Sequence, residues 1–250
     1  MNRRAYLLEE LGLAPRWVQR EAAVAPAPEA VTATTPVIER RETPRFVDQS
    51  AAQTLTREVS IGTMDWLQLK QAVRECVACQ LHTKRTQTVF GVGDEAADWL
   101  FIGEGPGAEE DARGEPFVGQ AGRLLDNMLA ALGMNRNRNV YIANVLKCRP
   151  PNNRAPEPAE ADACRPYLER QVALLQPKLI VALGKSAASL LLGTDATIAS
   201  LRGRVHQYRG VPLIVTYHPA YLLRSLPDKA KAWEDLLLAR RTVAESAGTV

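Results

Sequence analysis

The sequence predicts an α/β protein, a three-layer α/β/α sandwich with a central, mostly parallel sheet and a flexible N-terminal extension. From residue 64 onward, apolar runs of strand length alternate with longer segments of helical periodicity. Strands separated by helices pair in parallel, and the connecting helices then cover both faces of the sheet. Residues 22–62 lack this alternation and are rich in proline, alanine and threonine.

Local signals indicate where the elements begin and end. Asp65 can cap the N-terminus of one helix, and Gly133 is a typical residue just beyond the end of another. Pro158 is typical of a first helical turn, where its missing N–H is not needed. The predicted strands are 99–102, 140–146, 179–183 and 211–216, and the predicted helices are 65–75, 119–132, 158–175, 186–192 and 228–243.

Composition divides the chain into three parts. Residues 1–21 are expected to form a short helical segment, and residues 22–62 a disordered Pro/Ala/Thr-rich linker. Residues 63–245 are expected to form the folded domain. Hydrophobic residues make up 46% and charged residues 24% of the chain, as in ordinary globular proteins.

The sequence gives no signal for a membrane or an export route. No apolar stretch approaches the roughly 18 residues of a membrane span. Glu9 and Glu10 interrupt what would otherwise be the apolar core of a signal peptide. We therefore expect a monomeric cytoplasmic protein, in which disulfides are disfavoured.

The four cysteines form two pairs, Cys76-x2-Cys79 and Cys148-x15-Cys164. Two cysteines separated by two residues can approach one metal centre from a single turn. Four soft thiolates suit tetrahedral Zn²⁺ or a [4Fe–4S] cluster, and spacing alone does not separate these two. Unlinked cysteines packed as small core residues are the plainer alternative. The paired arrangement favours a single metal site.

Basic residues gather between positions 133 and 156. This stretch contains no Asp or Glu, and its cations are Arg136, Arg138, Lys147, Arg149 and Arg154. The net charge of the whole chain is only +3. The cluster therefore predicts a local phosphate-binding surface rather than a general attraction to polyanions. A solvated loop is the alternative interpretation.

Polar residues follow the predicted strands at their carboxyl ends, where parallel sheets bind ligands. The turn 103–107 has the sequence Gly-Glu-Gly-Pro-Gly and lacks the spacing of both dinucleotide-binding and Walker motifs. A carboxylate repels phosphate, so Glu104 fits better as a general base or as a counter-charge to a developing cation. A structural turn with an exposed glutamate is the alternative.

Three further residues suit chemistry on a nucleobase. His218 follows the last predicted strand and can donate to an anionic leaving group. Asn144 offers an amide that can pair with the imide edge of a flipped base, and Phe117 can stack on that base. The Leu-Leu-Arg step at 222–224 suits a wedge in a base stack beside a phosphate contact. Single residues of these types are more often structural.

Taken together, these motifs resemble the family 4 uracil-DNA glycosylases, the iron–sulfur branch of the uracil-DNA glycosylase superfamily. The resemblance covers residues 65–241. It is carried by Cys76-x2-Cys79, the turn 103–107 with the acidic residues after it, residues 113–122, residues 144–151, Cys164 and residues 218–224. It implies the uracil-DNA glycosylase-like sandwich and, as substrate, uracil-containing DNA, single- or double-stranded.

The resemblance also implies roles for individual residues. Cys76, Cys79, Cys148 and Cys164 would bind a [4Fe–4S] cluster. Glu104 would activate water, and His218 would stabilise the departing base. The implied substrate contacts are Gly105, Glu110, Phe117 and Asn144, with Glu110 near uracil C5, where it would help to exclude thymine. The expected DNA contacts are Lys147, Arg149, Arg154, Leu222, Leu223 and Arg224.

Two other functions fit part of the sequence. A non-catalytic iron–sulfur or zinc protein that binds nucleic acid would explain the cysteines and the basic stretch, but not Glu104, Asn144 and His218. A nucleotide-binding enzyme would use the glycine-rich turn for phosphate, which Glu104 disfavours. Residues 1–21 would serve, in addition, to bind a repair or replication protein.

Overall fold

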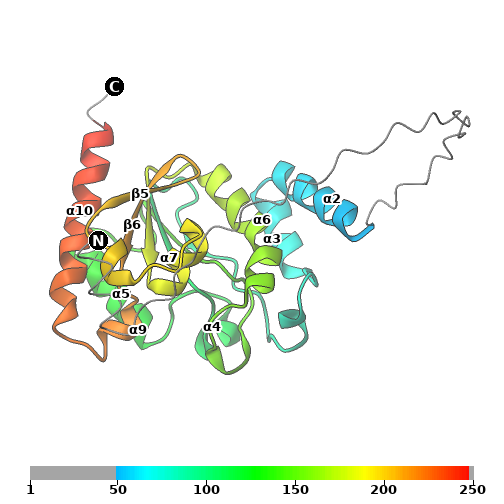
Figure 1. Cartoon of the computed structure of the whole chain (residues 1–250), viewed down its shortest axis with the longest axis horizontal. Coiled ribbons are helices and arrows are strands. Elements are labelled where there is room, and N and C mark those ends of the chain that lie inside the picture. The colour runs from blue at the N-terminus through cyan, green and yellow to red at the C-terminus, as the bar shows by residue number, and fades with distance from the viewer. Residues whose placement is uncertain (1–48, 248–250) are drawn as a thin grey trace, which may run out of the picture. The chain divides into compact units, whose positions relative to one another are not determined.

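Six strands form one sheet in the order β1-β3-β2-β4-β6-β5 in the computed structural model, which describes residues 49–247 (Figure 1). The four central strands are parallel, and the two edge strands are antiparallel to their neighbours. The strands are β1 (Val92–Gly93), β2 (Trp99–Gly103), β3 (Val140–Asn144), β4 (Leu179–Leu183), β5 (Val205–Tyr208) and β6 (Val211–Thr216). The prediction of a mostly parallel sheet is confirmed.

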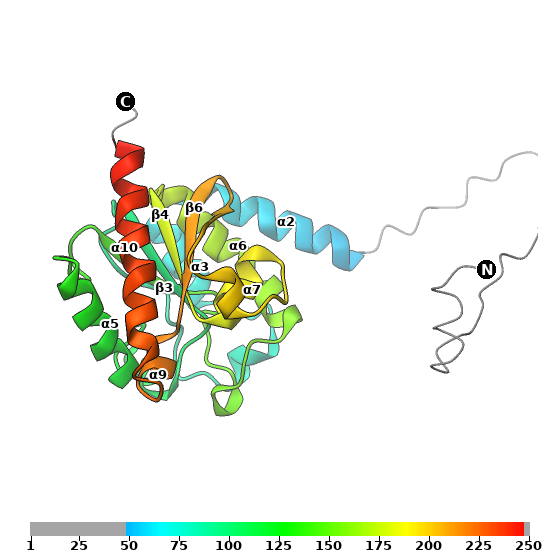
Figure 2. The ribbon, with the colours of Figure 1, turned by 60° about the vertical axis from the view of Figure 1, so that its left-hand side comes forward.

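Helices cover both faces of this sheet. Because side chains alternate along a strand, Leu100 and Ile102 of β2 enter one core, whereas Trp99 and Phe101 enter the other. The first core packs against α6 (Pro158–Leu175), α7 (Lys185–Leu192) and α8 (Ile198–Leu201), and the second against α5 (Gln120–Ala131) and α10 (Asp228–Ala247). Figure 2 shows the sheet between these two layers, which confirms the predicted sandwich.

The remaining helices are short or lie before the sheet. The helix α3 (Trp66–Arg74) begins with a capping box: Gln68 N donates to Asp65 Oδ1 at 2.8 Å, and Asp65 N donates to Gln68 Oε1 at 3.0 Å. The others are α2 (Gln49–Thr63), α4 (Ala108–Arg113), α9 (Pro219–Leu222) and the 3-10 helices η1 (Gln80–Thr83) and η2 (Pro151–Asn153). None of the helices in residues 49–247 is long and apolar enough to cross a membrane.

Every helix and strand predicted within residues 63–245 is present, and the short elements β1, β5 and α4 are among those that the sequence did not predict. These elements are two to six residues long. Their residues are exposed or only half-buried apart from Asp111 of α4, so they carry no run of apolar side chains. Strand β1 depends on pairing with β3, which is distant in sequence, whereas β5 pairs with the adjacent β6 across a two-residue turn.

Helix α2 corrects the predicted boundary of the linker. Residues 49–62 were expected to belong to a disordered linker at 22–62, yet they form most of α2. Ile61 is buried against α3 and α6, and Arg57 donates to the carbonyl oxygen of Ala163 at 2.9 Å. These contacts stabilise a helix that its own sequence does not specify. The helix predicted at 1–21 and the first part of the linker lie outside the described residues.

Candidate active site and cysteine cavity

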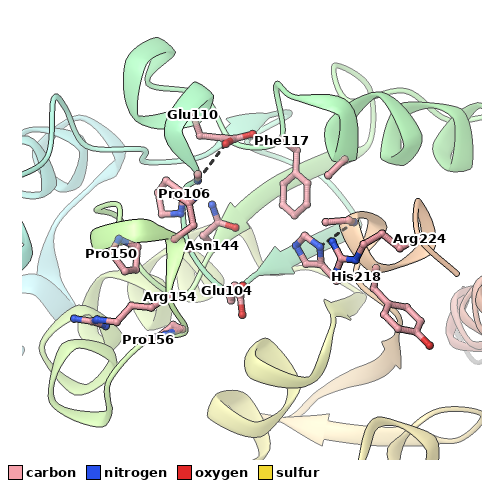
Figure 3. A pocket seen from close by; sticks show the side chains of 16 residues that line it. Glu104, Pro106, Glu110, Phe117, Asn144, Pro150, Arg154, Pro156, His218 and Arg224 are labelled. Carbon is pink, nitrogen blue, oxygen red and sulfur yellow. Dashed lines mark hydrogen bonds between the residues drawn. The ribbon is translucent and has the colours of Figure 1, made fainter.

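A cavity of about 480 Å³ opens at the carboxyl ends of the parallel strands, a volume typical of a small-molecule site. Its walls come from the turn after β2, the loop before α5, the end of β3, the loop before α6 and the segment after β6. Figure 3 shows Phe117, Asn144 and His218 around one central space, with Glu104 beside it. The structure thus brings these four sequence-predicted residues together. Gly105 and Glu110 also line the cavity.

Close approach of the backbone at Gly103 sets the width of this cavity. Gly103 and Asn144 are paired in the register of β2 and β3. A Cβ atom at position 103 would lie 2.4 Å from Asn144 Oδ1 and 2.7 Å from Phe117 Cζ. Only glycine leaves room for both side chains, so this residue determines how near the amide and the aromatic ring come.

Phe117 is held in an unusual backbone conformation. Its φ is +56°, in the left-handed region that a residue with a side chain rarely adopts. Gly122 lies directly behind it, where a Cβ would come within 1.7 Å of Phe117 O. Arg136 donates to that same oxygen at 3.0 Å and also pairs with Asp126. The ring is thereby fixed in a stack with His218, with 5.5 Å between the ring centres.

The carboxylate of Glu110 joins the two loops that border the cavity. Its Oε2 accepts from Gly107 N at 3.1 Å, and its Oε1 accepts from Val118 N at 3.0 Å and Gly119 N at 3.3 Å. Charged hydrogen bonds of this type are stronger than those between neutral groups. Glu110 therefore fixes the loop that carries Phe117, in addition to lining the cavity.

The imidazole of His218 has one nitrogen engaged by the backbone. Ala220 N donates to His218 Nδ1 at 3.1 Å. Burial lowers the pKa of His218 from its usual value, and Arg224 acts in the same direction, while Glu104 and Glu110 oppose the change. The ring is therefore neutral near pH 7, and its single proton must lie on Nε2, because Nδ1 is an acceptor. This arrangement leaves Nε2–H as a donor.

The four cysteines converge around a second, smaller cavity, as the sequence predicted. Cys76 and Cys79 follow α3, Cys148 follows β3, and Cys164 lies on α6. None forms a disulfide. Burial raises the pKa of Cys79 and of Cys148, and it raises the pKa of Cys164 to about 12. These thiols become thiolates only when a cation replaces their protons.

Hydrogen-bond donors surround the cysteine sulfurs. Arg85 Nη1 donates to Cys148 Sγ at 3.2 Å and to the carbonyl oxygen of Cys76 at 2.8 Å. The backbone N–H of Lys147 donates to Cys164 Sγ at 3.3 Å. From α2, Arg57 reaches Cys76 Sγ at 3.9 Å. Such donors stabilise negative charge on sulfur and so offset part of the effect of burial on Cys148 and Cys164.

Comparison with known proteins identifies the family. Residues 90–237 match the model of the uracil DNA glycosylase superfamily. The type-4 uracil-DNA glycosylase of Archaeoglobus fulgidus is 46% identical over 166 residues, 62% of this chain and 83% of the relative. The type-4 enzyme of Thermotoga maritima is 46% identical over 165 residues, 65% of this chain and 85% of the relative. This chain belongs to the type-4 uracil-DNA glycosylases.

A third relative covers even more of the chain. The type-4 uracil-DNA glycosylase of Pyrobaculum aerophilum is 41% identical over 183 residues, 70% of this chain and 93% of the relative. The family resemblance predicted from the sequence is thus confirmed, and with it the fold class.

Two residues of this glycosylase that were expected to contact DNA are buried in the protein. Lys147 is 1% exposed, and its ammonium donates to Asn144 O at 2.8 Å and to Gln171 Oε1 at 2.6 Å. Leu222 is also 1% exposed and packs with Tyr217 and Ala232. Both predictions are wrong for the same reason: position in a sequence motif does not reveal on which side the side chain packs.

The other cations of the basic stretch are mostly engaged within the protein. Arg154 pairs with the buried carboxylate of Glu160 at 2.6 Å and with Glu157 at 3.0 Å, and its guanidinium points away from the centre of the cavity in Figure 3. Arg149 donates to Asn153 Oδ1 at 2.8 Å. Acidic residues just beyond the stretch therefore neutralise Arg154. Leu223 and Arg224 remain exposed beside the cavity.

Sequence reasoning missed several residues that shape the two sites. Arg57 and Arg85 lie 19 and 63 residues from the cysteines whose sulfurs they contact. Asp111 accepts from Thr86 N at 3.0 Å and so joins the cysteine segment to α4 beside the active site. No local pattern marks these partners, because each acts on a segment that only the fold brings near.

We predict that Glu110→Gln lowers the free energy of unfolding by about 1–3 kcal/mol, since the new NH₂ group would face a backbone N–H donor. Glu109→Gln is a matched control in the same first turn of α4, so any effect of the helix dipole is common to both variants. Urea unfolding measures the difference. Equal stability of the two variants would contradict a role for Glu110 in joining the loops.

Proposed function

We propose that this enzyme binds a uracil flipped out of DNA in the large cavity and hydrolyses its N-glycosidic bond, releasing uracil and leaving an abasic site. The observation that carries the proposal is the convergence of Glu104, Phe117, Asn144 and His218, from four segments of the chain, on one cavity at the strand ends. A cavity of about 480 Å³ has room for a base, its sugar and a water molecule.

Phe117 and Asn144 would select the base. The Phe117 ring provides an apolar face for stacking, and its fixed backbone means that little ordering is needed when the base arrives. The Asn144 side chain can donate to O4 of uracil and accept from its N3–H. Cytosine presents an amine and an unprotonated N3 at those positions, so it would leave two polar groups unpaired.

His218 would stabilise the leaving group. Breaking the C1′–N1 bond places negative charge on the uracil ring, and the Nε2–H of a neutral imidazole can donate to O2 as that charge develops. The bond from Ala220 N fixes the tautomer that makes this donation possible. Removing a preorganised donor of this kind typically slows a reaction by about 10²–10³-fold.

Glu104 would act on the sugar side of the bond. As the base departs, the sugar gains oxocarbenium character, and a carboxylate nearby balances that positive charge. The same carboxylate can orient water and accept its proton as the water attacks C1′. The step therefore balances: the proton of the attacking water passes to Glu104, and the electron pair of the broken C1′–N1 bond leaves with uracil.

Exposed residues after β6 would support the DNA around the flipped nucleotide. Leu223 is 43% exposed and is the part of the predicted wedge that can enter a base stack, since Leu222 is buried. Arg224, next to it, can bind a phosphate. Extrusion of the nucleotide costs a few kcal/mol, which such contacts offset.

We further propose that the four cysteines bind a [4Fe–4S] cluster. The donor set fits, because four thiols from three segments surround one cavity with N–H donors directed at three of the sulfurs. When bound, the cluster would brace these segments.

We expect Glu104→Gln and His218→Ala each to reduce uracil release by about 10²-fold or more while DNA binding changes little. Quenched single-turnover assays on uracil-containing oligonucleotides, together with binding to an abasic-site oligonucleotide, measure the two effects. Glu109→Gln and His206→Ala are matched controls outside the cavity and should retain activity. An active Glu104→Gln, His218→Ala double variant would overturn the proposal.

The lowered pKa of His218 predicts a pH dependence. The unfolded chain binds a proton near pH 6.5, whereas the folded chain resists protonation because burial disfavours the charged imidazolium. The contribution of neutral His218 to the free energy of unfolding is therefore fully present above about pH 6.5. It is lost as the pH falls toward the pKa of His218 in the folded protein. Urea unfolding between about pH 5 and 7.5 measures this loss. His218→Asn keeps an acceptor for Ala220 N but cannot titrate, so its free energy of unfolding should fall less at low pH than that of the wild type. Equal losses in the two proteins would contradict a pH dependence that originates at His218.

Anaerobic purification should yield about four iron atoms per chain with charge-transfer absorbance. Cys148→Ser or Cys164→Ser should lose iron and absorbance, and removal of iron should lower the melting temperature, because the cluster would join α3, α6 and the loop after β3. Stoichiometric zinc in place of iron would contradict the cluster.

A further inference from the structure

Lys147 lies between the two cavities and contacts the border of each. It follows β3 and lines the cysteine cavity, where its own N–H donates to Cys164 Sγ at 3.3 Å. The ammonium donates to the carbonyl oxygen of Asn144 at 2.8 Å, and Asn144 lines the active-site cavity.

The charge of Lys147 has no carboxylate partner. Within the described part of the chain, its ammonium is bonded to a carbonyl oxygen and to Gln171 Oε1 at 2.6 Å, both of them neutral. A fully buried cation without a counter-charge is strongly unfavourable. Cys148 and Cys164 line the cysteine cavity together with Lys147, and both would become anionic thiolates on binding a metal. The buried ammonium and the thiolates can therefore neutralise one another.

The groups that hold the Lys147 ammonium are themselves fixed by hydrogen bonds. Gln171 donates to Phe90 O at 3.0 Å, which fixes the amide that holds the ammonium. Val145 N and Leu146 N donate to the carbonyl oxygens of Gly103 and Glu104 at 2.9 and 3.0 Å. The segment from Asn144 to Cys148 is thus held against the active-site turn, and Lys147 closes a loop within it by bonding back to Asn144.

We propose that Lys147 is a positioning residue that couples the cysteine site to Asn144. Its ammonium balances thiolate charge and at the same time fixes the Asn144 peptide, so that the amide stands at the edge of the base. This inference rests on the proposed function, since it concerns the residue that would select uracil. It assigns a role to a lysine that the sequence suggested for DNA contact.

Lys147→Met tests the coupling, because methionine has a similar length and carries no charge. Lys178→Met is the matched control: Lys178 pairs with Asp98 at 3.1 Å on the surface and touches neither cavity. We expect Lys147→Met to slow single-turnover uracil release by roughly 10–100-fold, as a small misplacement can do. Iron loss to a chelator should be several-fold faster. Lys178→Met should match the wild type in both measurements.

A double-mutant cycle separates positioning from general packing. If Lys147 acts through Asn144, Lys147→Met should slow an Asn144→Ala enzyme little further, whereas independent effects would multiply. Gln171→Leu, which removes one anchor of the ammonium, gives a second cycle with Asn144→Ala if the lysine variant does not fold. Multiplicative effects in the cycle, or wild-type rates and iron retention for Lys147→Met, would overturn the inference.

The side-chain amide of Asn144 provides a readout that does not depend on activity. Its NMR resonances should move in Lys147→Met and stay in place in Lys178→Met; unchanged resonances would overturn the coupling. A wild-type protein that released no uracil would instead reject the proposed function, and the iron-retention and NMR comparisons would still decide whether Lys147 links the two sites.

Discussion

The parallel pairing of β2 with β3 is the constraint on which both sites depend. Its register sets Gly103 opposite Asn144, and the backbone bonds continue one step beyond the strands to Glu104 and Leu146. The turn with the carboxylate and the strand with the amide are thereby held at one edge of the sheet. Cys148 follows Asn144 by only four residues, so the pairing of β2 with β3 also positions one side of the cysteine cavity.

Contacts with the backbone hold the side chains near this strand pair in place. Glu110 accepts from three backbone N–H groups, His218 accepts from Ala220 N, and Phe117 is held by Gly122 and Arg136. Preorganisation of this type reduces the reordering needed when a substrate enters. It also explains why the active site contains strained backbone at Phe117, since the ring must stand over the cavity although its φ is unfavourable.

The two cavities differ in chemistry but share structural supports. Arg85 and Asp111 join the segment after the first two cysteines to neighbouring elements, while Lys147 lies between the cysteine cavity and Asn144. The proposed division of labour follows from these contacts: the cysteine site orders the loops, and the polar residues at the strand ends carry the reaction. Helix α2 also supports the cysteine site, because Arg57 contacts both Cys76 and α6.

The sequence by itself determined the strands, the long helices and the segments that carry chemistry. Apolar periodicity, capping residues and the glycine-rich turn are local signals, and the alternation of strands with helices dictates where strand ends meet. Tertiary structure decided which of these side chains are exposed and which are buried or paired within the protein. Lys147 and Leu222 stand in motifs that the sequence predicts at the DNA surface yet are buried, Arg154 pairs with Glu160, and α2 packs against α6. These outcomes depend on which side chains the fold brings together, and some of the partners, such as Gln171 for Lys147 and Ala163 for Arg57, lie 24 and 106 residues away along the chain.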